Sequence, residues 1–376
     1  MPEFMTYADS GPNYDDMDPY KIKATRAALL TGNNAVRLGF EDVPWSRGES
    51  CYLMKAPWGY LAHVEEGLGT KNIVADAMYQ LMLVGKLSHG YDHSFYRHVA
   101  QCTVAMIVND MLTLGALPVS IAMHLAVAES KWLTDGLRVD ELIDGWKQAC
   151  DLSGAVWAGG ETPTLRDLVM PKRIILSGSA LGVIIPKERV IKPNIQHGDS
   201  IILLGSSGIH ANGLTLARDI AKKLPKGYRT PVGKSTYGEE LLKPTIIYRQ
   251  FIENCLKNRI DIHYAVNITG HGWRKLMRAV EPFVYVIDRI PEPQPIFGFI
   301  QEHGPVTDEE MYGNYNMGAG FAVFVRPDVA PIVLRIADKY GYSALQAGYV
   351  DKRGGEKKLI IRPKNLEYEG SSLAVR

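Results

Sequence analysis

Apolar side chains recur at intervals of three and four residues along the first half of the chain, which is the spacing of one helix face. This pattern predicts helices over 71–84, 98–115 and 139–154, and Gly154 marks the end of the third. Asp110 continues the apolar stripe of the second predicted helix. An unpaired buried carboxylate is costly, so Asp110 either finds a partner or is a helix-end residue that faces water.

Short apolar runs bounded by glycine or polar residues predict strands. They lie at 155–160, 173–185, 201–205, 283–288 and 321–326. Helices and strands are mixed without strict alternation, which favours an α/β chain of α+β or mixed-sheet domains over one doubly wound sheet.

The polar segment 187–200 separates two apolar strands and predicts a domain boundary. A chain of 376 residues is long enough for more than one core, so we expect domains over 1–190 and 191–376. Residues 1–50 are polar and rich in turn-forming residues, and we expect them to add little to either core.

Composition narrows the class of protein. The formal net charge is +1, which gives no reason to expect nucleic acid or an anionic membrane surface as a partner. No apolar run reaches the ~18 residues of a membrane span, and no signal-peptide pattern precedes the polar start. Cys51, Cys102, Cys150 and Cys255 lack metal-ligand spacing and are typical of reduced thiols in a cytoplasmic protein.

The stretch 63–76, HVEEGLGTKNIVAD, combines a glycine turn with charges of both signs. Gly67, Gly69, Thr70 and Lys71 would let backbone and ammonium approach phosphates at a helix start. The two glutamates before this turn would repel phosphate unless a cation lies among them.

A second glycine loop, LGSSGIHANG at 204–213, follows a predicted strand and precedes a predicted helix. Its backbone N–H groups and the positive end of the helix dipole suit a phosphate, with Ser206, Ser207, Gly208, His210 and Asn212 beside it. The alternative is a plain strand-to-helix turn in which the glycines serve only geometry.

Three further motifs are weaker. Glu161 and Thr162 follow a strand and a glycine pair in AGGETPT, and Thr269 and Gly270 belong to NITGHGW. Each also fits an ordinary turn. GYRTPVGKS at 227–235 nearly spells a phosphate-binding loop, but five residues separate its glycines where that motif needs four, so we interpret it as a surface loop.

In chain order, these motifs resemble aminoimidazole ribonucleotide synthetases, also called phosphoribosylformylglycinamidine cyclo-ligases. YADSGPNYD resembles the family's N-terminal signature, and GLGTK resembles its glycine loop. NDMLTLGALP keeps the family's Asp-x4-Gly-Ala-x-Pro pattern at Asp110, Gly115, Ala116 and Pro118. GGET, GSSGIHANG, LLKPTIIY, NITGHGW and EEMYGNYNMGAG then follow in family order.

The resemblance implies an ATP- and Mg²⁺-dependent ring closure in purine synthesis, and it leaves a K⁺ requirement open. Phosphorylation of the formamide oxygen of formylglycinamidine ribonucleotide would make it a good leaving group. The implied fold is a two-domain PurM-like one, in which the N-terminal sheet closes a barrel across a homodimer.

The resemblance also implies roles for individual residues. The catalytic residues would be Lys71, Asp110 and His210, and the metal ligands would be Glu66, Asp110 and Glu161. The nucleotide would be bound by Gly67, Gly69, Thr70, Lys71, Asn109, Glu161 and Thr162. The ribonucleotide would be bound by Ser206, Ser207, Gly208, His210, Asn212, Thr269 and Gly270.

Two departures from the family pattern keep other hypotheses open. Glu65 and Glu66 replace the usual Thr-Asp, and the segment 85–98 is unusually rich in histidine and tyrosine. The alternatives are another ATP-using relative, of the thiamine-monophosphate kinase or selenophosphate synthetase type, or a non-catalytic nucleotide-binding homologue.

Overall fold

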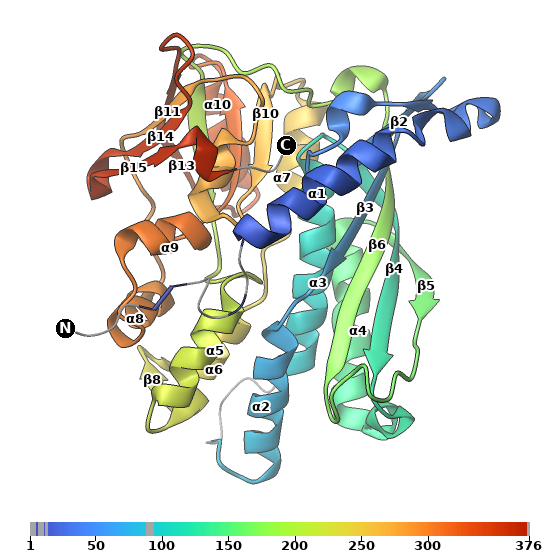
Figure 1. Ribbon diagram of the computed structural model, residues 1–376, viewed down its shortest axis with the longest axis vertical. Coiled ribbons are helices and arrows are strands. Elements are labelled where there is room, and N and C mark those ends of the chain that lie inside the picture. The colour runs from blue at the N-terminus through green and yellow to red at the C-terminus, as the bar shows by residue number, and fades with distance from the viewer. Residues whose placement is uncertain (1–4, 7–10, 12–13, 88–93, 374–376) are drawn as a thin grey trace.

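The computed structural model describes residues 5–6, 11, 14–87 and 94–373, and the chain forms two mixed sheets, each with its own helices (Figure 1). The boundary that we predict at 190/191 falls between the last strand of the first sheet and the first strand of the second. The mixed α/β class predicted from the sequence is confirmed.

The first sheet has six strands in the order β1-β2-β3-β6-β4-β5. Their bounds are β1 Glu41–Asp42, β2 Tyr52–Ala56, β3 Gly59–Gly67, β4 Leu117–Val127, β5 Val156–Glu161 and β6 Ile174–Ile184. Only the β4–β5 pair is parallel, and β5 is an edge strand. Along β6, buried and more exposed residues alternate, as expected for a sheet with one covered face.

Helices α2 (Lys71–Leu83), α3 (Phe95–Leu112) and α4 (Gly136–Ser153) belong to this half. They confirm the three helices predicted from apolar spacing, and each starts within about three residues of its predicted position. α3 packs on β3, β4 and β6, while α4 packs on α3 and β5. Gly154 ends α4 in the left-handed conformation, which glycine adopts without a steric penalty.

The second sheet has seven strands in the order β10-β12-β7-β13-β11-β14-β15. Their bounds are β7 Ser200–Gly205, β10 Tyr264–Asn267, β11 Val284–Ile287, β12 Ala319–Val325, β13 Ala344–Asp351, β14 Lys358–Ile361 and β15 Leu366–Glu369. A separate small hairpin pairs β8 (Pro231–Val232) with β9 (Ser235–Thr236). Four strands of this sheet are buried along nearly their whole length, namely β7, β10, β11 and β12. The sequence of each is therefore a nearly continuous apolar run.

Six helices accompany this sheet in the described part of the chain. They are α5 Leu214–Lys223, α6 Tyr237–Leu242, α7 Arg249–Lys257, α8 Pro295–His303, α9 Asp308–Asn314 and α10 Ala330–Lys339. The segment 227–235, which nearly matches a phosphate-binding motif, forms a 3₁₀ turn and most of the β8–β9 hairpin, consistent with a surface loop.

The first fifty residues add little to either core, as expected, because Val43 is the only buried apolar side chain among those that the structure describes. They contain a sixteen-residue helix, α1 (Tyr14–Leu29), that lies across the junction of the two halves (Figure 1). Its mean apolar character is low and Pro19 lies inside it, so helical spacing gave no signal. Most of the YADSGPNYD signature and the centre of the 85–98 segment lie outside the described residues.

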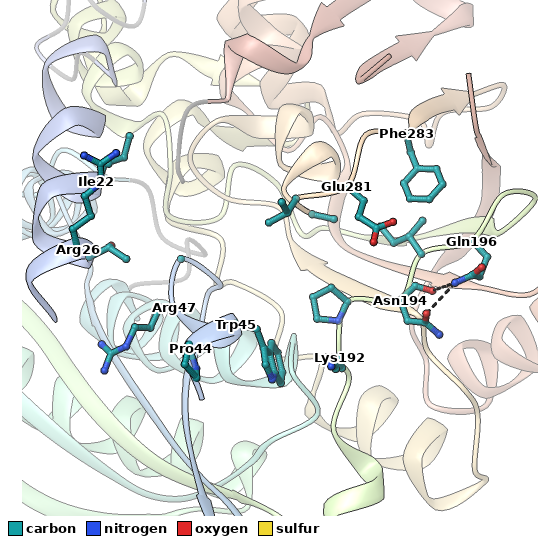
Figure 2. A pocket seen from close by; sticks show the side chains of 16 residues that line it. Ile22, Arg26, Pro44, Trp45, Arg47, Lys192, Asn194, Gln196, Glu281 and Phe283 are labelled. Atoms are coloured by element: carbon teal, nitrogen blue, oxygen red, sulfur yellow. Dashed lines mark hydrogen bonds between the residues drawn. The ribbon is translucent and has the colours of Figure 1, made fainter. Parts of the chain in front are cut away.

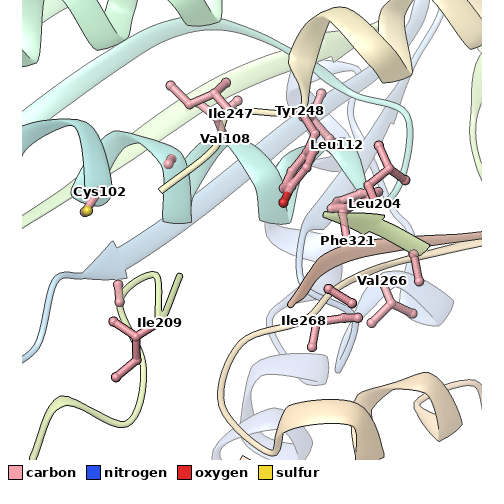
Figure 3. Close-up of a cluster of buried hydrophobic side chains, with 14 of the residues drawn as sticks. Cys102, Val108, Leu112, Leu204, Ile209, Ile247, Tyr248, Val266, Ile268 and Phe321 are labelled. Carbon is pink, nitrogen blue, oxygen red and sulfur yellow. The ribbon is translucent and has the colours of Figure 1, made fainter. Parts of the chain in front are cut away.

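The two halves share a continuous apolar core (Figure 3). Figure 3 shows Val108 of α3 beside Ile247, and Leu112 of α3 near Tyr248, Leu204 of β7 and Phe321 of β12. All of these side chains are buried. The position of one half relative to the other is therefore fixed by dry packing, which holds any site at the junction in a defined geometry.

Candidate active site

A cavity of about 540 Å³ lies at the junction of the two halves, beneath α1. Its lining includes three acidic and three basic side chains, from Glu49, Glu66, Asp110, Lys21, Lys275 and Arg278. Polar residues of the second half complete it, namely Asn212, Asn267, Thr269, Gly270 and His271. The cavity thus gathers opposite charges that are far apart in the sequence.

The acidic side of the cavity is built from the first half. Glu66 lies near the end of β3, and Asp110 lies in the last turn of α3, the helix that packs on β3. Their carboxyl groups are within hydrogen-bond reach of each other. Asn267, at the end of β10, donates its side-chain N–H to Asp110 Oδ1 at 2.7 Å. Asp110 therefore has the partner that its place on an apolar stripe required.

The basic side of the cavity comes from a 3₁₀ turn, Gly272–Met277, that begins within the NITGHGW motif. Lys275 extends from this turn into the cavity wall and donates a hydrogen bond to the hydroxyl of Thr269. Arg278, just after the turn, bonds the Gly48 carbonyl and the Ser50 hydroxyl across the junction. Lys275 was not among the residues predicted from the sequence. The signal that could have identified it is its position, five residues after Gly270 of the NITGHGW motif.

Burial and like charge perturb the carboxyl group of Glu66. Loss of solvation, with the neighbouring Asp110 carboxylate, raises the pKa of Glu66 to about 8. Loss of solvation also lowers the pKa of Lys275 to about 8, although the Asp110 charge opposes that shift. Two carboxyl groups this close favour a shared proton or a bound cation, which makes the cavity a candidate site of chemistry.

Lys71 does not line this cavity. Its ammonium is fully buried and donates to the carbonyl of His210 and to the carbonyl of Lys243, each at 2.7 Å. Burial lowers the pKa of Lys71, while the Cys102 thiol beside it acts in the opposite direction. The side chain that the sequence assigns to phosphates thus joins the two halves of the protein in this structure.

Lys71 is one member of a row of contacts to the segment 243–248. Gln101 donates to the Thr245 carbonyl at 3.0 Å. Asn109 donates to the Ile246 carbonyl at 2.8 Å and accepts from the Tyr248 N–H at 3.1 Å. Asn109, predicted to bind nucleotide, therefore has its side-chain amide engaged between the halves and does not line the cavity.

The polar groups of the GSSGIHANG loop bond mainly within the second half. The Ser206 hydroxyl donates to Asn316 Oδ1 at 2.9 Å, and the Ser207 hydroxyl donates to the Pro244 carbonyl. The Ser207 N–H donates to Nε2 of buried His210. Burial, with the nearby Lys71 charge, lowers the pKa of His210 to about 3, so its imidazole is neutral.

Of the predicted ribonucleotide-binding residues, Asn212, Thr269 and Gly270 line the cavity. The two glycine loops also approach each other, since the Thr70 and Thr215 hydroxyls are 3.4 Å apart at the starts of α2 and α5. Ser206, Ser207, Gly208 and His210 lie behind this surface, and Gly67 and Gly69 are exposed beside it.

Glu161 and Thr162 lie elsewhere in the single chain. Both are exposed at the end of edge strand β5. The register pairs Glu66 with Gly178, Gly178 with Met123 and Met123 with Gly160. Three strand spacings thus separate this part of β5 from Glu66, which is roughly 14 Å. Within the described residues no group of three or more acidic, histidine or cysteine side chains is arranged to hold a metal.

The donor set nevertheless fits a magnesium ion in part. Glu66 and Asp110 supply hard oxygen ligands in contact with each other, and Mg²⁺ is commonly held by one or two carboxylates together with water and phosphate oxygens. The structure brings together two of the three expected metal ligands.

A second cavity, of about 570 Å³, adjoins the first (Figure 2). Thr25 and Gly48 line both cavities. Figure 2 shows Ile22 and Arg26 of α1 on one side, with Trp45 and Phe283 on the other walls. This neighbouring cavity is more apolar, and its lysine, Lys192, is exposed.

The fold and the cavity together define a two-domain enzyme-like scaffold with a charged site at the junction of its halves. The N-terminal domain model described as AIR synthase related protein matches residues 79–184, and the C-terminal domain model matches residues 196–360. The chain belongs to the AIR synthase related family that includes the phosphoribosylformylglycinamidine cyclo-ligases.

Curated relatives agree with this family. A phosphoribosylformylglycinamidine cyclo-ligase of Methanocaldococcus jannaschii is 37% identical over 77% of this chain and 78% of its own length. One of Methanococcus vannielii is 34% identical over 98% of this chain and 99% of its own. Among solved structures, hydrogenase maturation protein HypE in complex with ATP matches with a TM-score of 0.57 at 14% identity, over 84% of this chain and 87% of that one. That last likeness concerns the fold alone.

Among the helices of the described residues, none has the length and apolar character needed to cross a membrane.

Proposed function

We propose that this protein converts formylglycinamidine ribonucleotide and ATP into aminoimidazole ribonucleotide, ADP and phosphate. The observation that carries the proposal is the cavity in which Glu66 and Asp110 of one half face Lys275, Asn267 and Thr269 of the other. Relatives that carry the cyclo-ligase name and match 77% and 98% of this chain support the same assignment.

The chemical difficulty is that a formamide oxygen does not leave as hydroxide. Its attack on the γ-phosphorus of ATP releases ADP, and loss of the formamide N–H proton leaves an iminophosphate. The amidine nitrogen then bonds to the activated carbon, phosphate departs, and the nitrogen loses a proton. Phosphoryl transfer needs mainly positioning and charge stabilisation, which fits a cavity with fixed charges of both signs.

The residues of this chain have separate tasks in the proposal. Glu66 and Asp110 would hold Mg²⁺, which would offset phosphate charge and orient the phosphoryl oxygens. Asn267 fixes the Asp110 carboxylate through its hydrogen bond. Asn212, Thr269 and Gly270 contact the ribonucleotide, and buried His210 holds the loop that precedes Asn212.

A homodimer would complete the site. The first sheet presents large apolar side chains that are about half exposed, among them Val119, Ile175 and Leu181. An apolar patch of this kind is typical of an interface. Packing this face against a second copy is also a route by which the exposed Glu161 of one subunit reaches the cavity of the other.

The dimer has its own test. Leu181→Glu places a charge in the centre of the apolar face and should yield monomers in sedimentation velocity. Ile332→Glu, at a site 40% exposed on α10 of the second half, is the matched control and should leave the wild-type mass unchanged. A monomeric wild-type protein would exclude the dimer.

The activity is tested with purified protein, Mg²⁺, ATP and formylglycinamidine ribonucleotide carrying ¹⁸O in the formyl group. The expected products are aminoimidazole ribonucleotide, ADP and ¹⁸O-labelled phosphate in equal amounts. Absence of the aminoimidazole product and of substrate-dependent ADP would reject the function. ADP release with thiamine monophosphate instead would assign the protein to the other ATP-using relatives.

A further inference from the structure

The structure contains a lysine that the family resemblance does not assign and that faces the two acidic residues of the cavity. We infer that Lys275 binds the phosphoryl group that passes from ATP to the substrate. This inference rests on the proposed function and assigns to Lys275 the task that the sequence alone gives to Lys71.

The two lysines differ in the N–H donors that they have available for a ligand. An ammonium has three N–H donors. Lys71 directs its donors at two backbone carbonyls outside the cavity, so a phosphate could reach it only by breaking contacts between the halves. Lys275 lies in the cavity wall, and its one described hydrogen bond is to a neutral hydroxyl, that of Thr269.

The other cations of the cavity, Lys21 and Arg278, already have protein partners. Lys21 pairs with Asp18 at 2.8 Å. The Arg278 guanidinium donates hydrogen bonds to the Gly48 carbonyl and the Ser50 hydroxyl. In the described part of the chain Lys275 makes no ion pair within 4.0 Å, although its charge acts on Asp110 and Glu66.

A transferred phosphoryl group carries negative charge on its oxygens, and the charges around it must offset that. Its oxygens need positive charge on the side of the metal ligands and also on the opposite side. Glu66 and Asp110 line the cavity from the first half, and Lys275 lines it from an element of the second half. A phosphoryl group bound in this cavity beside the two carboxylates would therefore contact Lys275 directly.

The position of Lys275 is held by its neighbours. The turn that carries it is anchored by Trp273, whose indole N–H donates to the Asn316 carbonyl at 2.7 Å, and by Arg274, which bonds the Gly313 carbonyl. A lysine on an anchored turn loses less entropy on binding an anion than a surface lysine would. The geometry therefore favours a binding function over an incidental surface charge.

The decisive measurement is equilibrium binding of β,γ-methylene ATP and of ADP, each with Mg²⁺, by titration calorimetry. Wild-type protein should bind the triphosphate analogue more tightly than ADP. In Lys275→Met this preference should fall about tenfold, because one charged contact to the terminal phosphate is lost. A loss of folding alone would weaken both ligands equally and leave the ratio unchanged.

Two further variants keep the test decisive. Lys275→Gln removes the charge but can still bond Thr269, and it should lose the preference as Lys275→Met does. Lys192→Met removes an exposed lysine of the neighbouring cavity and should keep the wild-type ratio. An unchanged ratio in both Lys275 variants, or a wild-type protein without a preference, would overturn the inference.

Turnover separates this inference from the proposed function. If wild-type protein forms aminoimidazole ribonucleotide, Lys275→Met should lower kcat by about a hundredfold or more. Full kcat in that variant would reject the role of Lys275 and leave the function intact. A wild-type protein without this activity would reject the function, and the binding ratio would still decide whether Lys275 contacts the terminal phosphate.

Discussion

Lys71 and Lys275 are both enclosed at the junction of the two halves, yet their surroundings differ in kind. The buried Lys71 ammonium donates hydrogen bonds to two backbone carbonyls of the other half, so few of its N–H groups remain for a ligand. Lys275 meets one hydroxyl and faces a cavity shared with two carboxyl groups. A buried ammonium whose partners are all protein groups stabilises the fold, whereas one that borders a cavity can bind a ligand.

The largest effect should come from the acidic side of the Lys275 cavity. Asp110→Asn keeps the shape and a hydrogen bond to Asn267 but removes one charge beside Glu66. We expect kcat for ATP-dependent ring closure to fall by about 10²–10³, equivalent to about 3 kcal/mol. Steady-state kinetics over a Mg²⁺ series measure this loss.

The control for that variant is Glu65→Gln, because Glu65 is the adjacent acid and is exposed. It should leave kcat nearly unchanged. Wild-type kcat and metal dependence in Asp110→Asn would remove Asp110 from the site.

The next effect concerns the Lys71 contact and should appear in stability. Lys71→Met leaves the His210 and Lys243 carbonyls without their donor, which should lower the free energy of unfolding by about 2–3 kcal/mol. Urea unfolding measures the change. Lys222→Met, which removes an exposed lysine paired with Asp219, should cost less than about 0.5 kcal/mol.

Binding sharpens the same comparison. Folded Lys71→Met protein should keep the wild-type preference for β,γ-methylene ATP over ADP. A lost preference together with full stability would reverse the roles of the two lysines.

A pH effect should follow from the neutral, buried His210. Its pKa is about 3 in the folded protein, against an ordinary value of about 6.5 in the unfolded chain. The unfolded state therefore binds the extra proton first, so this contribution to stability is complete above pH 6.5 and is lost as the pH falls toward 3. Between pH 7 and pH 5 the loss should be about 2 kcal/mol.

Urea unfolding at both pH values checks the histidine effect against His210→Asn. Asparagine tolerates the positive φ of 58° at this position and does not titrate. The variant should lose about 2 kcal/mol less than wild type on acidification. Equal acid sensitivity in the two proteins would assign the effect to other groups, such as His271, whose pKa burial also lowers to about 3.

The smallest effect should come from a single contact in the row beside Lys71. Gln101→Ala removes one hydrogen bond to the Thr245 carbonyl and should lower the free energy of unfolding by about 1 kcal/mol. Urea unfolding measures it, and kcat should remain at the wild-type value. A large loss of kcat at unchanged stability would place Gln101 in the site instead of in the contact between halves.

Local patterns were enough for much of the fold and part of the site. Apolar spacing located α2, α3 and α4, because helix periodicity is visible in a short window of sequence. The same stripe singled out Asp110, because a carboxylate among buried side chains requires a partner. α1 was missed because it is polar on most of its surface and depends on the junction that it covers.

By itself, the sequence determined the mixed α/β class, the order of motifs that marks the family, and the presence of charged residues in glycine-rich turns. Only the tertiary structure decided which lysine joins the acidic residues. Lys71 begins a helix whose start meets carbonyls of the other half, while Lys275 follows strand β10, whose last residue, Asn267, donates a hydrogen bond to Asp110. The reason is physical: the task of a charged group depends on whether the packed halves surround it with protein acceptors or leave it facing a cavity, and no local pattern records that difference.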